Sequence, residues 1–187
     1  MTPRRRFCFA TIAAMTVSVV MSATSFADNS LAGNEVPASC PVTLPSEPAF
    51  VPPGPYPPAP PGSPDMFWHG TPGLWTMLYS NGVHRGLPTA SKRYPGVDAM
   101  RNKSFWWSPG FHPVGPPEAL KVKGRRLDSD APPLEQPWVT NAEVPEFGGW
   151  TMLTMLELPL GCWEVTGSYG SNSVTFVVWV LPPKPRE

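Results

Sequence analysis

The sequence predicts an all-β protein that folds as a single antiparallel β-sandwich preceded by a proline-rich N-terminal arm. Two observations predict the sandwich. From residue 73 onward, short apolar segments are separated by turn signals about every 8 to 12 residues. Beyond the first 27 residues, no segment has the 3.6-residue apolar period of an amphipathic helix. We therefore expect about seven short strands in residues 67–182, almost no helix, and a tail over 183–187.

The first 27 residues have the composition of an export signal. Arg4, Arg5 and Arg6 precede an apolar stretch over 7–21, and small residues mark a cleavage point after Ala27. The apolar stretch is shorter than the roughly 20 residues of a membrane-spanning helix. We expect residues 1–27 to be a signal peptide, the mature protein to be periplasmic or extracellular, and no stable membrane insertion. The arginines leave both the general and the twin-arginine export routes open.

Removal of this signal changes the net charge of the chain. The full sequence is neutral, whereas residues 28–187 carry 11 Lys and Arg against 14 Asp and Glu, a net charge of −3. This balance gives the mature chain no overall attraction for a polyanion. We therefore expect no nucleic-acid partner.

Two cysteines remain after the signal, Cys40 near the start of the mature chain and Cys162 near its end. In an oxidising compartment an even pair of cysteines more often forms a disulfide than a metal site. We predict a bond between Cys40 and Cys162. Loop-closure entropy gives a bridge around about 120 residues a stabilisation on the order of 4 kcal/mol.

Residues 28–66 form the predicted arm. Ten of the twenty residues 45–64 are proline, and this density excludes helix and central strand, because proline lacks the backbone N–H and has a fixed φ. The arm is interpreted as a surface spacer or as a ligand for an aromatic groove on a partner. A bond between Cys40 and Cys162 tethers the start of the arm to the domain that follows it, so we expect the arm to loop along that domain.

The first strands of the sandwich are predicted as a hairpin. Residues 74–80 and 83–87 flank the pair Asn81-Gly82. Asn-Gly supplies the two positive φ angles of a type I′ turn, which joins adjacent antiparallel strands.

The later strands follow from alternation of side chains. Residues 120–125 alternate apolar and basic side chains, which predicts one face in the core and one in water. Residues 150–158 and 174–181 are apolar on both faces, which predicts central strands covered on both sides. Residues 161–168 alternate again, and a turn around Gly170 predicts a hairpin of the last two strands.

The segment 159–167 ends a loop in Gly161 and then turns Trp163 and Val165 to the same side. It resembles the penultimate strand of immunoglobulin-like domains, and the resemblance implies an immunoglobulin-like β-sandwich. With Trp163 and Val165 inside, alternation turns Cys162 outward. The disulfide is then expected to pin the arm across the outside of the sandwich.

Six short motifs mark the mature chain. They are Cys-Pro-Val-Thr at 40–43, Gly-Leu-Trp-Thr at 73–76, Phe-Trp-Trp at 105–107, Gly-Arg-Arg-Leu-Asp at 124–128, Ala-Pro-Pro-Leu at 131–134 and Gly-Cys-Trp-Glu-Val-Thr-Gly at 161–167. Together they resemble a group of small exported bacterial proteins with no assigned function. The resemblance implies an architecture and no activity, and its two cysteine motifs agree with the predicted disulfide. The proline arm is longer than this group leads us to expect.

Eight tryptophans are the strongest chemical signal in the sequence. Trp106 and Trp107 are adjacent on a predicted strand, so they point to opposite faces and we expect one of them to be exposed. With Trp68 and His69 in a loop-like segment, they form a candidate site for sugar rings or for the apolar patch of a partner. The alternative is that these rings cover the ends of the sandwich or clamp the proline arm. The tryptophans inside strand patterns are expected in the core: Trp75, Trp150, Trp163 and Trp179.

Two further binding hypotheses rest on weaker patterns. His69 with Met66 is an alternative copper site, because a thioether suits Cu(I). The three histidines have no metal-ligand spacing, however, so no metal or cofactor is expected. An anionic envelope polymer is the second hypothesis, although a solvated strand face explains most of the same residues: Lys121, Lys123, Arg125 and Arg126.

No nucleophile elbow, phosphate-binding loop or metalloprotease motif occurs in the chain. We therefore do not expect an enzyme. The sequence favours a non-catalytic binding or structural module whose partner is an envelope protein or a polysaccharide. A carbohydrate-binding module that uses exposed aromatics is the first alternative, and a periplasmic metal-binding protein is the second.

Overall fold

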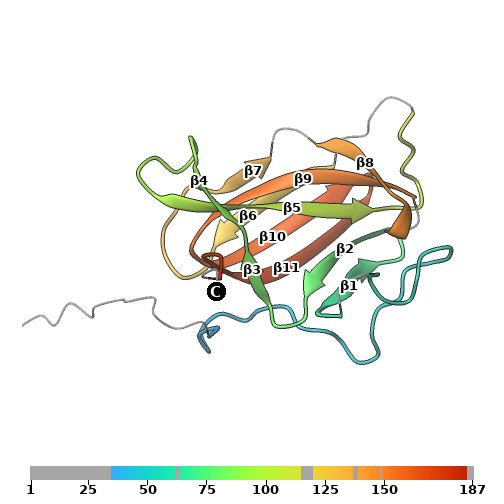
Figure 1. The fold of residues 1–187 in the computed structure, drawn as a ribbon, viewed down its shortest axis with the longest axis horizontal. Coiled ribbons are helices and arrows are strands. Elements are labelled where there is room, and N and C mark those ends of the chain that lie inside the picture. The colour runs from blue at the N-terminus through green and yellow to red at the C-terminus, as the bar shows by residue number, and fades with distance from the viewer. Residues whose placement is uncertain (1–34, 62–63, 115–119, 137–138, 148, 185–187) are drawn as a thin grey trace, which may run out of the picture. The chain divides into compact units, whose positions relative to one another are not determined.

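The computed structural model describes residues 35–61, 64–114, 120–136, 139–147 and 149–184. The predicted signal peptide, residues 1–27, lies outside them, and so do residues 185–187 of the predicted tail. The regular secondary structure of the described residues consists of strands and one short 3-10 helix, Pro145–Phe147 (Figure 1). None of them belongs to a helix that is long and apolar enough to cross a membrane.

The strands of the described residues form two sheets. Their bounds are β1 Met66–Thr71, β2 Leu74–Tyr79, β3 Val83–Arg85, β4 Leu87–Ala90, β5 Asp98–Trp107, β6 Lys121–Arg126, β7 Leu134–Gln136, β8 Thr140–Val144, β9 Gly149–Pro159, β10 Gly161–Tyr169 and β11 Asn172–Leu181. Sheet A has the order β1-β2-β5-β9-β8, and β4 also pairs with β5. Sheet B has the order β3-β11-β10-β6-β7. The pairing of β3 with β11 is parallel, and the other pairings are antiparallel.

The connections between the sheets are those of an immunoglobulin-like sandwich. In that fold, strands A, B, E and D share one sheet and strands C, F and G share the other. Here β2, β5, β9 and β8 take the places of A, B, E and D, and β6, β10 and β11 take those of C, F and G. The predicted all-β sandwich is confirmed.

Trp106 of β5 shows how closely the two sheets pack. Its indole is fully buried and lies against Phe176 of sheet B, with ring centroids 5.9 Å apart. A Cβ atom on Gly167 of β10 would collide with this indole, so the glycine leaves the space that the ring fills. Trp163 is also fully buried, as predicted, and its Nε1 donates to the carbonyl oxygen of Pro159 at 2.9 Å.

Alternation predicted strands β6 and β10 of sheet B correctly. β6 buries Val122 and Gly124 and exposes the basic residues between them. β10 and β11 form the predicted hairpin, in which Tyr169 pairs with Asn172 around Gly170. β9 and β11 each have a strand on both sides, as expected of central strands.

The predicted hairpin across Asn81-Gly82 is wrong. β2 pairs with β1 and β5 in sheet A, whereas β3 pairs with β11, so this turn carries the chain from one sheet to the other. Of the two turn residues only Gly82 has a positive φ, of 68°. The Val83 amide donates to Asn81 Oδ1 at 3.0 Å, and the Trp179 amide donates to the Gly82 carbonyl at 2.9 Å. Docking of β3 on β11 therefore outweighs the local preference of Asn-Gly for a type I′ turn.

The predicted disulfide between Cys40 and Cys162 is present, with an S–S distance of 2.00 Å. Both cysteines are buried beside Trp179, outside the core that lies between the sheets. Thr43 follows the edge of β11: its amide donates to the Val177 carbonyl, and the Val177 amide donates to its Oγ1, both at 2.8 Å. The arm is thus pinned to the outside of the sandwich, as predicted.

Further along, the arm covers an aromatic cluster on the outer face of sheet A. Trp68, Trp75 and Trp107 form this buried cluster, and Tyr56 of the arm packs on it. The Tyr56 ring meets the Trp75 ring edge-on at a centroid distance of 5.0 Å. Trp68 Nε1 donates to the carbonyl oxygen of Pro57 at 3.0 Å. The aromatic rings clamp the proline arm, which is one of the two interpretations that the sequence left open.

Candidate functional site

Among the described residues, the middle of β5 has no strand neighbour on one side. β2 pairs with β5 only at Trp106 and Trp107, and β4 pairs only with residues 98–101. β9 runs along the other side of β5. Because β3 pairs with β11 in sheet B and not with β5, residues 102–105 of β5 border an opening in sheet A.

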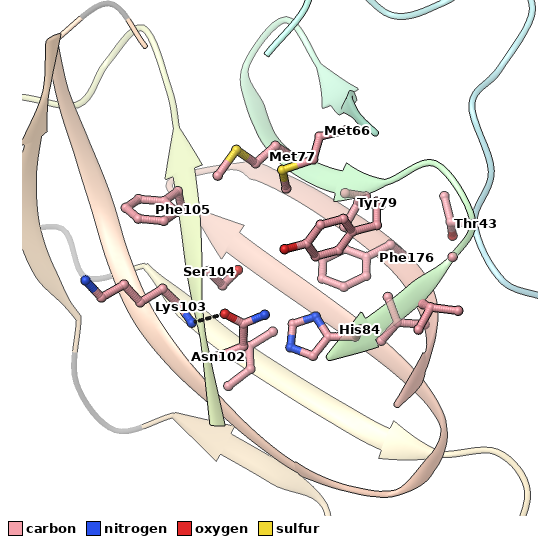
Figure 2. A pocket seen from close by; sticks show the side chains of 15 residues that line it. Thr43, Met66, Met77, Tyr79, His84, Asn102, Lys103, Ser104, Phe105 and Phe176 are labelled. Carbon is pink, nitrogen blue, oxygen red and sulfur yellow. Dashed lines mark hydrogen bonds between the residues drawn. The ribbon is translucent and has the colours of Figure 1, made fainter. Parts of the chain in front are cut away.

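A pocket of about 230 Å³ passes through this opening (Figure 2). Its mouth is lined by side chains from the outer face of sheet A, Met66 and Met77 among them, and its floor lies between the sheets beside Phe176 of β11. In Figure 2 the two thioethers lie at one end of the pocket, and His84 and Asn102 lie at the other. Thioethers therefore form one end of the pocket, and polar side chains form the other.

His84 brings an imidazole ring to the wall of the pocket. β3 pairs His84 with Val180 of β11, a core residue, so the ring points between the sheets. His84 is 8% exposed, and its Nε2 has no hydrogen-bond partner among the described residues. Burial lowers the pKa of His84 to about 4, so the ring is neutral at pH 7. A neutral imidazole has one donor and one acceptor, and Nε2 can take either role toward a ligand.

The turn before β3 determines where His84 lies. Gly82 has a positive φ and also leaves space for Val42 of the arm, because a Cβ atom on Gly82 would lie 2.5 Å from the Val42 side chain. The arm, the turn and β11 therefore pack together at this point. Their packing holds β3 in sheet B and directs His84 into the pocket.

Asn102 is fixed by two hydrogen bonds to the backbone. Its Nδ2 donates to the Arg85 carbonyl at 2.8 Å, and the Lys103 amide donates to its Oδ1 at 2.8 Å. The first bond ties β3 to β5 at the edge of the pocket. Three further hydroxyl groups line the pocket: that of Thr43, that of Ser104, which is 8% exposed, and that of Tyr79 at the mouth, which is 37% exposed.

Most of the remaining walls are apolar, and Lys103 adds an exposed cationic side chain. Met66, Met77 and Phe105 stand at the mouth, and Leu156 and Phe176 stand at the floor. Thioether side chains are flexible and polarizable, so they adapt to apolar ligands of different shape. Apolar walls with a few convergent polar groups are typical of a small-molecule site.

Acidic and thiol groups are absent from the part of the pocket that the structure describes, since its lining contains no Asp, Glu or Cys. No group of three or more His, Cys, Asp and Glu side chains in the described ranges is arranged to hold a metal ion.

The structure separates the residues of the predicted aromatic site. Trp106 lies in the core, and Trp68 and Trp107 lie under the arm, all three at most 2% exposed. The expectation that one of Trp106 and Trp107 is exposed is wrong, because sheet B covers one face of β5 here and the arm covers the other. Residues 67–69 belong to strand β1 and not to a loop. His69 Nε2 donates to the carbonyl oxygen of Thr175 at 2.9 Å.

Trp150 was expected in the core, and it is 44% exposed. It lies near the start of β9 and pairs with Glu143 of the edge strand β8, so it is at an end of the sandwich where few residues cover it. Trp75 and Trp179 are buried as expected, although they lie outside the main core, under the arm and beside the disulfide.

Met66 and His69 do not come together as a copper site. They are three residues apart on β1, so they point to opposite faces of sheet A. Met66 lines the mouth of the pocket, whereas the His69 ring lies 6.5 Å from that of Phe176 in sheet B.

The predicted basic strip of β6 is largely occupied by ion pairs. Arg125 Nε lies 2.7 Å from Glu164 Oε1, and Arg126 Nε lies 2.7 Å from Asp128 Oδ1. Lys123 lies 4.0 Å from Glu135, which leaves Lys121 as the member of the strip without a carboxylate partner among the described residues.

Sequence reasoning missed His84, Asn102 and Ser104. His84 stands in a three-residue strand that is too short to show alternation, and the opening in β5 depends on which strands pair with it. Comparison with models of protein families, with curated proteins and with solved structures gave no match.

Proposed function

We propose that this protein is an exported, non-catalytic binding module that holds a small uncharged ligand in the pocket between β2 and β5. The observation that carries the proposal is the buried Nε2 of His84, which lacks a hydrogen-bond partner in the described residues and belongs to a side chain that lines the pocket. An unpaired buried polar atom costs about 1 to 3 kcal/mol. A ligand that hydrogen-bonds to Nε2 recovers part of this free energy.

The lining indicates the class of ligand. A neutral imidazole and the hydroxyl of Ser104 suit a hydroxyl, carbonyl or amide group, while Met77 and Phe105 suit an apolar body. At roughly 30 Å³ for each water-sized group, a pocket of about 230 Å³ admits a small ligand. We therefore propose a ligand with a compact apolar body and one polar end.

Export is supported by the bond between Cys40 and Cys162, because disulfides persist in oxidising compartments. The composition of residues 1–27 supports it as well. Mass spectrometry of the protein from envelope and culture fractions is expected to show a chain that begins near residue 28. A chain that keeps residues 1–27 and stays in the cytosol would contradict export.

The two alternatives have less support. A carbohydrate-binding module that uses exposed aromatics is disfavoured because Trp68, Trp106 and Trp107 are buried. A metal-binding protein that uses Met66 and His69 is disfavoured because the two side chains lie on opposite faces of sheet A.

The test is to titrate the purified protein with cyclohexanol, phenol and benzamide while the methionine methyl groups are followed by NMR. At least one compound is expected to shift the methyl signals of Met66 and Met77. His84→Leu is expected to weaken that binding roughly tenfold, because about 1 to 2 kcal/mol of hydrogen bonding is lost.

His112→Leu is the matched control, because His112 is exposed and does not line the pocket. It is expected to bind as the unchanged protein does. If none of the three compounds shifts either methyl signal at millimolar concentration, or if the two variants bind equally well, the pocket is not the ligand site that we propose.

A further inference from the structure

Cationic side chains gather along one continuous depression of the surface, although the mature chain has no overall excess of positive charge. Three hollows follow one another, from β3 and β4 across β5 to β7 and β6. The first two share Arg101 and Met155, and the second and third share Arg93 and Gln136. We call this depression the basic groove, and eight cationic residues line it: Arg85, Lys92, Arg93, Arg101, Lys103, Lys121, Lys123 and Lys184.

Few carboxylates balance these charges. Glu157 and Glu135 line the groove among the described residues. Arg101 lies 2.6 Å from Glu157, and Lys123 lies 4.0 Å from Glu135, so both acids are already paired. Four lysines of the groove have no salt bridge to any described carboxylate: Lys92, Lys103, Lys121 and Lys184.

Backbone contacts hold the floor of the groove in place. The Arg93 guanidinium donates to the carbonyl oxygen of Pro133 at 3.4 Å and also to that of Glu135, which fixes the turn after β4 against β7. Gln136 of β7 donates through its Nε2 to the carbonyl oxygen of Met155 in β9. These bonds join sheet A to sheet B under the groove, so its cations are presented by a connected framework.

We propose that the basic groove binds an anionic polysaccharide, a chain whose sugar units carry carboxylate, sulfate or phosphate groups. The hollows measure about 460, 420 and 280 Å³ in series, which suits a linear polymer better than a single ion. Lysines spaced along the groove complement charges repeated along such a chain. The proposed export places the protein where glycans are the abundant polyanions.

The hollow that adjoins the groove supports a glycan over other polyanions. It shares Lys121, Lys123 and Glu135 with the last part of the groove and adds Thr166 and Ser168 of β10. Hydroxyl side chains both donate and accept hydrogen bonds, as sugar hydroxyls do. A polysaccharide chain therefore finds charge along the groove and hydroxyl partners at its end.

The test is to titrate the purified protein with heparin, polygalacturonate and neutral dextran at 50 and 500 mM NaCl. We expect both charged polymers to bind at the lower salt and to weaken strongly at the higher salt, and we expect dextran not to bind. The triple variant Lys92→Gln, Lys121→Gln, Lys184→Gln is expected to bind roughly tenfold more weakly. None of these lysines lines the pocket of His84, so binding of phenol serves as a separate readout.

The matched control is a triple variant that lowers the net charge equally at exposed positions outside the groove: Leu44→Glu, Val51→Glu, Val114→Glu. It is expected to bind heparin within about twofold of the unchanged protein. Equal losses in both triple variants, or no binding of either charged polymer at 50 mM NaCl, would overturn the proposal. Tighter binding of phosphatidylglycerol vesicles or single-stranded DNA than of heparin would replace the glycan by a lipid surface or a nucleic acid.

Discussion

Two regions between the same two sheets differ in what fills the space between them. Around Trp106 the indole crosses that space to meet Phe176, and Gly167 leaves room for it. Around His84, by contrast, a pocket of about 230 Å³ remains between the two sheets. Strand β5 contributes to both regions, with Trp106 in the first and Ser104 in the second. The space between the sheets is thus filled around Trp106 and partly open around His84.

Ring nitrogens without a hydrogen-bond partner in the described residues occur in both regions, at Trp106 Nε1 and at His84 Nε2. An indole buries roughly 150 to 250 Å², which at about 25 cal/mol per Å² stabilises by about 4 to 6 kcal/mol and outweighs its unpaired N–H. The smaller and more polar imidazole has no such compensation. The two nitrogens therefore differ in their surroundings, since that of Trp106 belongs to a filled region and that of His84 to a side chain that lines a pocket.

The largest expected loss of stability comes from truncating Trp106, whose indole fills the space between the sheets. Trp106→Ala removes an indole that is fully buried and fits against Gly167, so we expect the free energy of unfolding to fall by about 3 to 5 kcal/mol. Urea unfolding monitored by circular dichroism measures the change. Trp150→Ala is the control, because Trp150 is 44% exposed and should lose far less. Similar losses in the two variants would show that Trp106 is not the centre of a tightly packed region.

The next largest effect is the pH dependence of stability that buried His84 produces. His84 has a folded-state pKa of about 4, below its ordinary 6.5, because burial disfavours the charged ring. Between pH 6.5 and 4 the unfolded chain binds a proton that the folded protein does not. Stability is therefore fully present above pH 6.5 and falls by up to roughly 3 kcal/mol as the pH is lowered to 4.

Urea unfolding at pH 7.5, 5.5 and 4.5 measures this loss, and His84→Leu provides the comparison because it removes the titrating group. The difference in free energy of unfolding between the two proteins is expected to grow as the pH falls. Parallel pH profiles would mean that His84 is hydrated or protonated in the folded protein, and the open region would then resemble the surface.

Sequence patterns predicted sheet B better than sheet A for a physical reason. β6 and β10 have one face in the core and one toward solvent or the arm, so their side chains alternate in the sequence, as Val122 and Trp163 do with their neighbours. Strand β2 buries residues of both faces, because sheet B covers one face and the arm lies over Trp75 on the other. Alternation carries no signal there, and only the pairing partners decide the course of the chain.

The candidate site was unpredictable for a related reason. His84 enters the pocket because β3 pairs with β11, about 95 residues further along the chain, and because the Asn81-Gly82 turn crosses between the sheets. No local pattern contains that information. The disulfide was predictable because it needs only two cysteines and an oxidising compartment, and the packing of the arm followed from it in outline.

A smaller effect, a gain in stability, is expected when the His84 side chain is made apolar. His84→Leu replaces an unpaired polar ring by an apolar side chain, so we expect the free energy of unfolding at pH 7 to rise by about 1 to 2 kcal/mol. Thermal unfolding without added ligand measures the gain, and the exposed His112→Leu should show none. A loss of stability in His84→Leu would show that the imidazole has a hydrogen-bonded role in the protein itself. A gain together with lost binding would mean that function, and not stability, accounts for a histidine at this position.

The smallest effect concerns the arm, which covers the aromatic cluster on the outer face of sheet A. Trp68→Phe keeps a ring under the arm but removes the hydrogen bond from Nε1 to the carbonyl oxygen of Pro57, which costs about 1 kcal/mol. If this bond holds the arm against sheet A, its loss raises the population of the detached arm about fivefold. Chymotrypsin cleavage after Phe50, read by mass spectrometry under reduction, is expected to accelerate by that factor.

Trp150→Phe is the control, because it changes a ring away from the aromatic cluster and should leave the cleavage rate unchanged. Equal cleavage rates in both variants would show that ring packing and the disulfide hold the arm against sheet A. The hydrogen bond from Trp68 would then contribute little.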